Sequence, residues 1–281
     1  MKLIDKISEP GMPPKNNEDI WGISDTAAWV FDGATGLLPE NMIAPDGMTD
    51  PRWLVERANE FLNNRADQIN DIKTLYIDTQ KYCEDAFNAG KRKDVKDSGE
   101  YPSAASIIVK HLGDKIICGS ISDCTILIET DDGVDIVPPC PVHKAVDENS
   151  IKHMKVEIAK GLSLKEARAN VTPIILSQRK KANSPGGHSV FSLGTDLTDT
   201  VRVKEFAYIP NKHILMMTDG FYSIVEDYFQ YDDAGLMKTA IEGGLKPIYN
   251  MIRDIEDKDP EGIKYTRMKK SDDATAILIK M

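Results

Sequence analysis

Short apolar segments separated by turn residues recur along this chain, and they constrain its fold more than any other feature. Residues 20–31 have the pattern of a β-hairpin, with two apolar runs joined by the polar turn Ser24-Asp25-Thr26. The turn Asp131-Asp132-Gly133 likewise joins two strand-like runs. The predicted strands are 20–23, 27–31, 104–112, 115–121, 124–130, 134–137, 189–193, 203–209, 213–218 and 274–279.

Helical periodicity is confined to fewer and longer segments. The predicted helices outside 147–182 are 51–66, 76–92, 221–229 and 233–256. Region 147–182 is charged and poor in aromatic residues. There, Gly161 closes a first helix and the capping-box spacing of Ser163-Leu164-Lys165-Glu166 starts a second one. We expect Pro173 to kink or end that second helix.

The combination of hairpin-linked strands with a few long helices predicts an α+β fold. Two stacked antiparallel sheets with helices on their outer faces account for it better than a doubly wound parallel sheet. No internal repeat or low-complexity linker divides the 281 residues. We therefore expect a single domain, 1–281, with a helical flap-like insertion at about 141–190.

The charge and the cysteines limit the partners and the compartment. A formal net charge of −10 argues against a general binder of nucleic acid or of acidic membranes, because phosphate groups require a basic face. No signal-peptide segment and no apolar window near the ~20 residues of a membrane helix is present, so we expect a cytoplasmic protein. The four cysteines form no CxxC pair, and Cys118 and Cys124 are expected to be buried thiols.

Two Asp-Gly pairs differ from ordinary turns. Asp132 lies between two strand-like runs and fits a turn, whereas Asp32 and Asp219 each follow a strongly apolar strand directly. Further acidic pairs precede the first and the last predicted strands, namely Glu18-Asp19 and Asp272-Asp273. Sheets can bring such strand ends together at one edge.

Clustered carboxylates repel one another, and in proteins a bound hard divalent cation usually offsets this repulsion. Ligation by oxygen alone favours Mg²⁺ or Mn²⁺ over zinc or copper. The alternative is that these acids are ordinary surface charges, which the spacing alone leaves open.

The order of these segments resembles the protein phosphatase 2C family across nearly the whole chain. The similar segments are the opening acidic motif Asn17-Glu18-Asp19, the DGxxG-type Val30-Phe31-Asp32-Gly33-Ala34-Thr35-Gly36, the small-residue strand from Ser103, the loose GDS turn Gly119-Ser120-Ile121-Ser122-Asp123-Cys124, the SDG-type Met217-Thr218-Asp219-Gly220-Phe221 and the terminal Ser271-Asp272-Asp273-Ala274-Thr275.

The resemblance implies a four-layer α/β/β/α sandwich with a site for two Mg²⁺ or Mn²⁺ ions at one edge. By analogy, Asp32 bridges both cations, the Gly33 carbonyl ligates one, and Asp219 and Asp272 ligate the other. Glu18 and Asp19 would hold metal-bound water, and Asp123 with Asp219 would bind a weaker third cation. The implied reaction is hydrolysis of phosphoserine or phosphothreonine in proteins by a water that the two ions activate.

The substrate-handling residues depart from the family pattern. Pro14 stands where many members have a phosphate-binding arginine, and the adjacent Lys15 is the candidate substitute. Ala34-Thr35 replaces a histidine-glycine pair, Ser122 replaces the glycine of GDS, and Ser223 stands where an aspartate often follows SDG.

Arg179-Lys180-Lys181 ends a helical stretch. It is either a solvated helix C-terminus or a phosphate-steering patch beside the site, with Arg179 as the candidate substrate-binding residue. His188 lies in a loop that could line this flap, and the other histidines have no metal-ligand spacing.

Three functions remain open from the sequence. The first is a phosphoprotein phosphatase, the second a phosphatase of small phosphorylated metabolites, and the third an inactive regulatory module with the same fold. The presence of Asp32, Asp219 and Asp272 counts against the third. Oligomeric state has no signature in the sequence.

Overall fold

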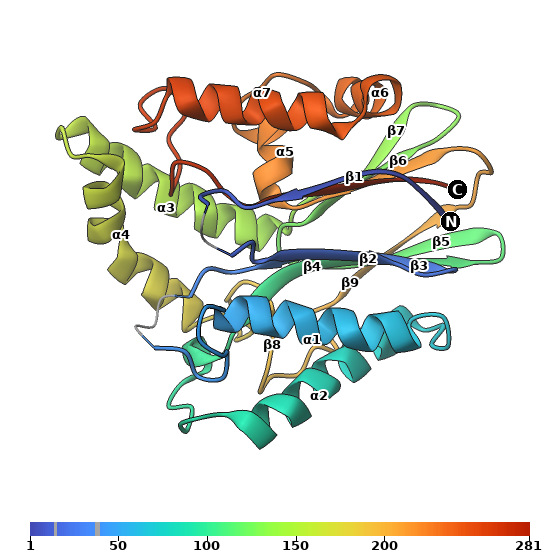
Figure 1. The fold of residues 1–281 in the computed structure, drawn as a ribbon, viewed down its shortest axis with the longest axis horizontal. Helices are drawn as coiled ribbons and strands as arrows, with labels where there is room; N and C mark the ends of the chain where they lie inside the picture. The colour runs from blue at the N-terminus through green and yellow to red at the C-terminus, as the bar shows by residue number, and fades with distance from the viewer. Residues whose placement is uncertain (14–15, 37–39) are drawn as a thin grey trace.

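Two antiparallel β-sheets stacked face to face form the centre of the protein in this computed structural model, which describes residues 1–13, 16–36 and 40–281 (Figure 1). One sheet has the strand order β1-β11-β10-β6-β7, and the other has the order β2-β3-β4-β5-β9, with β8 beside β4. The strands are β1 (Lys2–Glu9), β2 (Asp19–Ile23), β3 (Ala27–Gly33), β4 (Ser103–Leu112), β5 (Lys115–Ile121), β6 (Thr125–Glu129), β7 (Val134–Val137), β8 (Phe191–Ser192), β9 (Arg202–Ala207), β10 (His213–Met217) and β11 (Ala274–Lys280).

Helices cover the outer face of each sheet, which gives four layers (Figure 1). Below the β2-β3-β4-β5-β9 sheet lie α1 (Asp50–Arg65) and α2 (Ile72–Gly90), and above the other sheet lie α5 (Asp219–Glu226), α6 (Asp233–Gly243) and α7 (Leu245–Lys258). A short 3₁₀ turn, η1 (Ser98–Glu100), precedes β4. The predicted α+β sandwich is confirmed.

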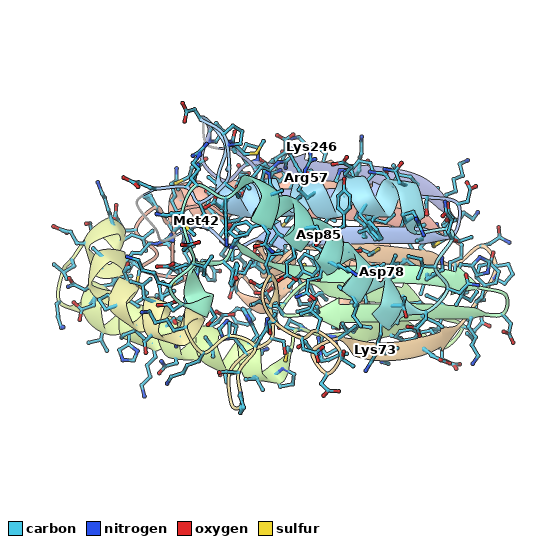
Figure 2. The ribbon with its side chains drawn as sticks, turned by 90° about the horizontal axis from the view of Figure 1, so that it is seen from below. Met42, Arg57, Lys73, Asp78, Asp85 and Lys246 are labelled. Carbon is cyan, nitrogen blue, oxygen red and sulfur yellow. The ribbon has the colours of Figure 1, made fainter. Side chains whose placement is uncertain are left out.

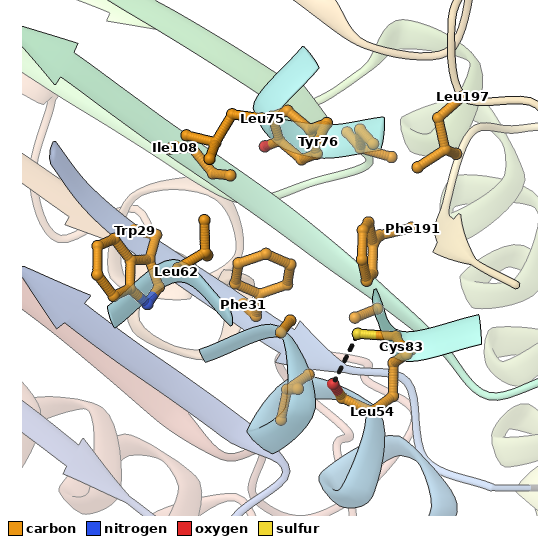
Figure 3. Packing of buried hydrophobic residues seen from close by; sticks show 14 of the residues in the cluster. Trp29, Phe31, Leu54, Leu62, Leu75, Tyr76, Cys83, Ile108, Phe191 and Leu197 are labelled. Carbon is orange, nitrogen blue, oxygen red and sulfur yellow. Dashed lines mark hydrogen bonds between the residues drawn. The ribbon is translucent and has the colours of Figure 1, made fainter. Parts of the chain in front are cut away.

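Each interface between layers has its own apolar core, because alternate residues of a strand point to opposite faces. Trp29 and Phe31 of β3 point toward α1 and α2, and Ala28 and Val30 point toward the other sheet. Figure 3 shows the outer core, where the Phe31 ring meets Phe191 edge-on at 5.3 Å between centroids. All four cysteines are buried and reduced, as the sequence predicts for Cys118 and Cys124.

The outer helices present charge to the solvent. Figure 2 views the molecule from below and shows Asp78 and Asp85, seven positions apart on the outer side of α2. Leu75 and Cys83 of the same helix are buried. This arrangement is the amphipathic pattern of a helix that covers a sheet.

Helices α3 (Pro141–Ala159) and α4 (Leu164–Arg179) lie at one end of the sandwich, and we call them the helical pair (Figure 1). They share a small core whose buried members are Met154, Leu164, Ala167 and Val171. The predicted capping box of α4 is present, with Ser163 and Glu166 bonded reciprocally. Helix α4 does not end at Pro173 but continues to Arg179, and its ribbon changes direction along the way.

Two secondary-structure elements differ from prediction. The single helix expected over 233–256 is two helices, because Gly244 adopts a φ of 77° that stops α6. The carboxylate of Asp5, from β1, then accepts a hydrogen bond from the Leu245 N–H at 2.8 Å and caps α7. Strand β1 itself was not predicted, because four of its eight residues are charged and its apolar alternation is weak.

Within residues 1–13, 16–36 and 40–281, no helix combines the length and the apolar character needed to cross a membrane.

Candidate active site

The acidic residues singled out in the sequence meet at the end of the sandwich beside the helical pair. Strand pairing sets Asp19 directly opposite Asp32, the second-last residue of β3. Asp32, Asp219 and Asp272 line one cavity of about 580 Å³, together with Glu18, Gly33 and Asp123. We call the carboxylates of Glu18, Asp32, Asp219 and Asp272 its acidic wall.

A hydrogen bond between the two sheets fixes Asp19. The Thr218 hydroxyl, at the end of β10, donates to Asp19 Oδ2 at 3.0 Å, and Thr218 also pairs with Thr275 of β11. Asp19 is 1% exposed, and its second oxygen, Oδ1, has no hydrogen-bond partner within the part of the chain that the structure describes. A buried carboxylate oxygen without a partner is costly, and a water or a cation would relieve that cost.

Asp219 is the first residue of α5 and not the last residue of a strand. The helix N-terminus stabilises its negative charge, because the first N–H groups of the helix are unpaired and the dipole is positive there. Gly220 permits the close approach of the 272–273 loop: a Cβ at this position would lie 2.0 Å from the Asp273 carbonyl oxygen. Gly220 therefore allows the segment that carries Asp219 to pack closely against the segment that carries Asp272 and Asp273.

Asp273 positions the opening acidic motif. Its carboxylate accepts hydrogen bonds from the Gly11 N–H at 2.8 Å and from the Glu18 N–H at 2.6 Å. On the other side, the Arg52 guanidinium donates to the Asp19 carbonyl at 2.7 Å. The Glu18 carboxylate, 6% exposed, accepts a hydrogen bond from Thr49 at 2.7 Å.

The cluster raises the pKa values of its own members. Burial first, and then repulsion from Asp19, Asp219 and Asp272, raises the pKa of Asp32 well above its usual range. Burial and repulsion from Asp273 and Asp272 raise the pKa of Asp19 to about 8.

The pKa of Asp219 is also raised well above its usual value. The side chain is accessible from the cavity, and the shift comes from the densely packed protein around it and from the charges of Asp272 and Asp123. This part of the cavity therefore favours added positive charge.

Two arginines of the helical pair, Arg168 and Arg179, line the same cavity, and we call them its basic wall. Arg179 is half-buried and donates from Nη1 to the Thr35 carbonyl at 2.7 Å, whereas Lys180 and Lys181 of the same basic stretch are exposed. Burial and the neighbouring Arg168 lower its pKa to about 10, which leaves it charged at neutral pH. Lys269 Nζ forms an ion pair with Asp272 and lies 3.4 Å from the Thr35 hydroxyl.

A separate group surrounds Asp123 at the β5–β6 turn. His143 Nε2 lies 2.9 Å from Asp123 Oδ2 and 3.0 Å from Asp147 Oδ2, both His143 and Asp147 coming from α3. The Ser122 hydroxyl lies 2.6 Å from His143 Nδ1, and Ser122 holds a φ of 70°, a conformation that glycine adopts without strain. Burial opposes ionisation of both partners, but their mutual attraction lowers the pKa of Asp123 and raises that of His143.

Among the described residues, Asp123, His143 and Asp147 are the group of three whose ligand atoms all lie within 4.8 Å of one another. Asp32, Asp219 and Asp272 share the cavity without meeting that closely as a trio. The oxygen donors, the unpartnered Asp19 Oδ1 and the raised pKa values fit hard divalent cations such as Mg²⁺ or Mn²⁺.

The structure thus brings Glu18, Asp19, Asp32, Gly33, Asp123, Asp219, Asp272 and Arg179 to one end of the sandwich. Lys15 and Pro14 lie outside the described residues. Sequence analysis did not identify His143, Asp147 or Lys269. No spacing rule links His143 to Asp123, whereas Lys269 carries one usable signal, a basic residue three positions before an acid already assigned to the site.

Neither protein-family models nor the sequences of curated proteins match this chain. Its fold does match solved structures. The serine/threonine phosphatase PstP/Ppp of Mycobacterium tuberculosis aligns with 100% of this chain and 99% of its own, at a TM-score of 0.57 and 12% identity. The photosystem II phosphatase PBCP aligns with 99% of this chain and 97% of its own, at 0.58 and 14%.

A third match is the catalytic domain of PstP in complex with two manganese ions, which covers 97% of this chain and 95% of that domain at a TM-score of 0.54 and 12% identity. Near-complete coverage in both directions means that the whole architecture is shared. At these identities the likeness establishes the fold. The chain therefore has the protein phosphatase 2C fold.

Proposed function

We propose that this protein is a metal-dependent phosphatase that hydrolyses phosphoserine and phosphothreonine in proteins. The observation that carries the proposal is one cavity lined both by closely set carboxylates and by basic side chains. A phosphate monoester needs both, because its reaction requires positive charge at the phosphoryl oxygens and a bound, acidified water. The PstP catalytic domain, which shares the fold, binds two manganese ions.

Each acidic residue has a role in this proposal. Asp32, the Gly33 carbonyl, Asp219 and Asp272 would hold two Mg²⁺ or Mn²⁺ ions, and Asp123 with Asp219 would hold a weaker third ion. When bound, such ions acidify water and neutralise charge that develops on the phosphoryl group. Glu18 and Asp19 would orient water, since Asp19 Oδ1 has no protein partner among the described residues.

Arg179 is the proposed phosphate-binding residue of the described chain. Its guanidinium already donates to Thr35, so its remaining N–H groups can form paired hydrogen bonds with phosphate oxygens. Lys15 remains a second candidate. The KM values of Lys15→Ala and Arg179→Ala, measured side by side, would show how much each residue contributes to phosphate binding.

Hydrolysis of p-nitrophenyl phosphate with and without Mn²⁺ tests the proposal. We expect Mn²⁺-dependent turnover that Asp32→Asn abolishes. Asp132→Asn is the matched control, because Asp132 is also followed by glycine but lies in an exposed turn between β6 and β7. No turnover at saturating Mn²⁺ would instead favour an inactive module.

The substrate class needs a second comparison. The helical pair carries Arg168 and Arg179 at the cavity wall, and an extended phosphopeptide can reach both them and the carboxylates. We expect phosphopeptides to be hydrolysed with higher kcat/KM than small phosphorylated metabolites. The opposite preference would identify the protein as a metabolite phosphatase.

A further inference from the structure

Among the described residues, Lys269 is the lysine that lines the cavity. Its side chain is 21% exposed, and its ammonium forms an ion pair with Asp272, a carboxylate of the acidic wall. Asp32 and Asp219 lie near enough to add to this attraction. Burial opposes the charge, but the carboxylates outweigh it and raise the pKa of Lys269 above its usual value.

The backbone around Lys269 is held in place, so movement is left to the side chain. The Arg267 guanidinium donates to the Lys270 carbonyl at 2.8 Å and the Tyr265 carbonyl at 2.8 Å. Arg253 donates to the Asp272 carbonyl at 2.6 Å. A lysine on such a segment presents a compact charge on a flexible four-carbon stem.

The ammonium also has a second partner within reach. Thr35 Oγ1 lies 3.4 Å from Lys269 Nζ, and the Thr35 carbonyl accepts the hydrogen bond from Arg179. Lys269 thus lies between the acidic wall and the basic wall of the cavity. Its ammonium therefore contacts Asp272 and Thr35 at the same time.

We propose that Lys269 is a tethered counter-ion that competes with a divalent cation for Asp272. It neutralises the acidic wall when no cation is bound, and it gives up Asp272 when a cation binds there. The proposal rests on the proposed function, because it takes Asp272 as a ligand. The proposal gives Lys269 a role in setting the affinity for the metal ion, because its ammonium is itself a cation within the same carboxylate cluster.

The physical reason is linkage between two positive charges at one carboxylate. Removing the ammonium leaves the acidic wall with less compensation, so the metal-free state rises in free energy and the metal-bound state changes less. A variant without this charge should therefore bind cations more tightly. A residue that only packs would shift both states equally.

The test is titration calorimetry of the full chain with Mn²⁺, comparing wild type with Lys269→Met and Lys269→Gln. We expect the Kd for Mn²⁺ to fall by about tenfold in both variants, the size of a one-unit electrostatic shift. We also expect a lower Tm in EDTA and an unchanged Tm at saturating Mn²⁺. Lys270→Met is the matched control, since Lys270 is exposed and pairs with Asp257 outside the cavity.

The outcomes separate the two proposals. Mn²⁺ binding to wild type with an unchanged or higher Kd in both variants would overturn the role of Lys269 alone. No Mn²⁺ binding to wild type would overturn the metal site, and both proposals with it. Equal losses of Tm with and without Mn²⁺ would show that Lys269 acts only through packing. Should Lys269→Met fail to fold, circular dichroism of Lys269→Gln, which retains a hydrogen-bonding end, selects the variant to titrate.

Discussion

The two walls of the cavity are built in different ways. The acidic wall stands on strand ends and on the first turn of α5, and apolar cores on both sides of each sheet hold these elements. The basic wall stands on the helical pair, whose own buried core has four residues. Repelling carboxylates need a rigid frame to stay together, whereas groups that meet a substrate can stand on a part that opens at low cost.

The largest expected effect is on the acidic wall. Asp219→Asn should lower kcat by at least about a thousandfold, because one neutral amide replaces a charged ligand at the reacting centre. The same change should raise the Tm of the metal-free protein, since it removes a repulsion within the cluster. Steady-state kinetics at saturating Mn²⁺ and calorimetry in EDTA measure the two effects. Activity near that of wild type would show that Asp219 is not a ligand.

A large-to-small substitution in each of two apolar cores tests whether the helical pair unfolds independently of the sandwich. Leu54→Ala, in the α1 core, should lower global stability by about 2–5 kcal/mol. Met154→Ala, in the core of the helical pair, should speed amide exchange in α3 and α4 and leave the strands protected. Hydrogen-exchange mass spectrometry of both variants makes the comparison. If Met154→Ala exposes the strands as well, the two regions unfold as one unit and the contrast fails.

Smaller effects are expected from the basic wall. Arg179→Ala should lower kcat/KM by about tenfold, chiefly through KM, because a charge-assisted contact with phosphate is lost. Lys180→Ala is the neighbouring control, since Lys180 points outward and pairs with Asp97. A fall confined to kcat would place Arg179 in the transition state and not in substrate binding.

The smallest effect is a pH dependence at His188, in the loop after the helical pair. Burial, and next the charge of His143, lowers the pKa of His188 to about 4. The unfolded chain takes up a proton below a pKa near 6.5 and the folded chain only near 4, so stability is lost as the pH falls between these values. Urea unfolding at pH 7 and pH 5 should show a loss on the order of 1 kcal/mol that His188→Gln lacks. An equal loss in both proteins would assign the acid sensitivity to other groups.

Local patterns in the sequence predict the layers of the fold and the strand ends at which most of the cavity's carboxylates lie. Alternation in β3 places Trp29 and Phe31 on one face of the sheet and Ala28 and Val30 on the other. The capping box of Ser163 and Glu166 lies at the start of α4, as its spacing in the sequence predicts. Acids that follow apolar strands, such as Asp32, are visible because the signals for strand, turn and cap lie within a few residues of one another.

Contacts between side chains far apart in the sequence depend on the packing of the whole fold. Helix α7 begins directly after Gly244, and its first N–H, that of Leu245, donates to the carboxylate of Asp5, a residue 240 positions earlier in the chain. His143 reaches Asp123 because α3 begins beside the β5–β6 turn, where the Cys140 N–H donates to the Ser122 carbonyl at 2.8 Å. Such contacts depend on how sheets stack and where loops return, and no local pattern in the chain carries that information, because the partners are neighbours in space and not in sequence.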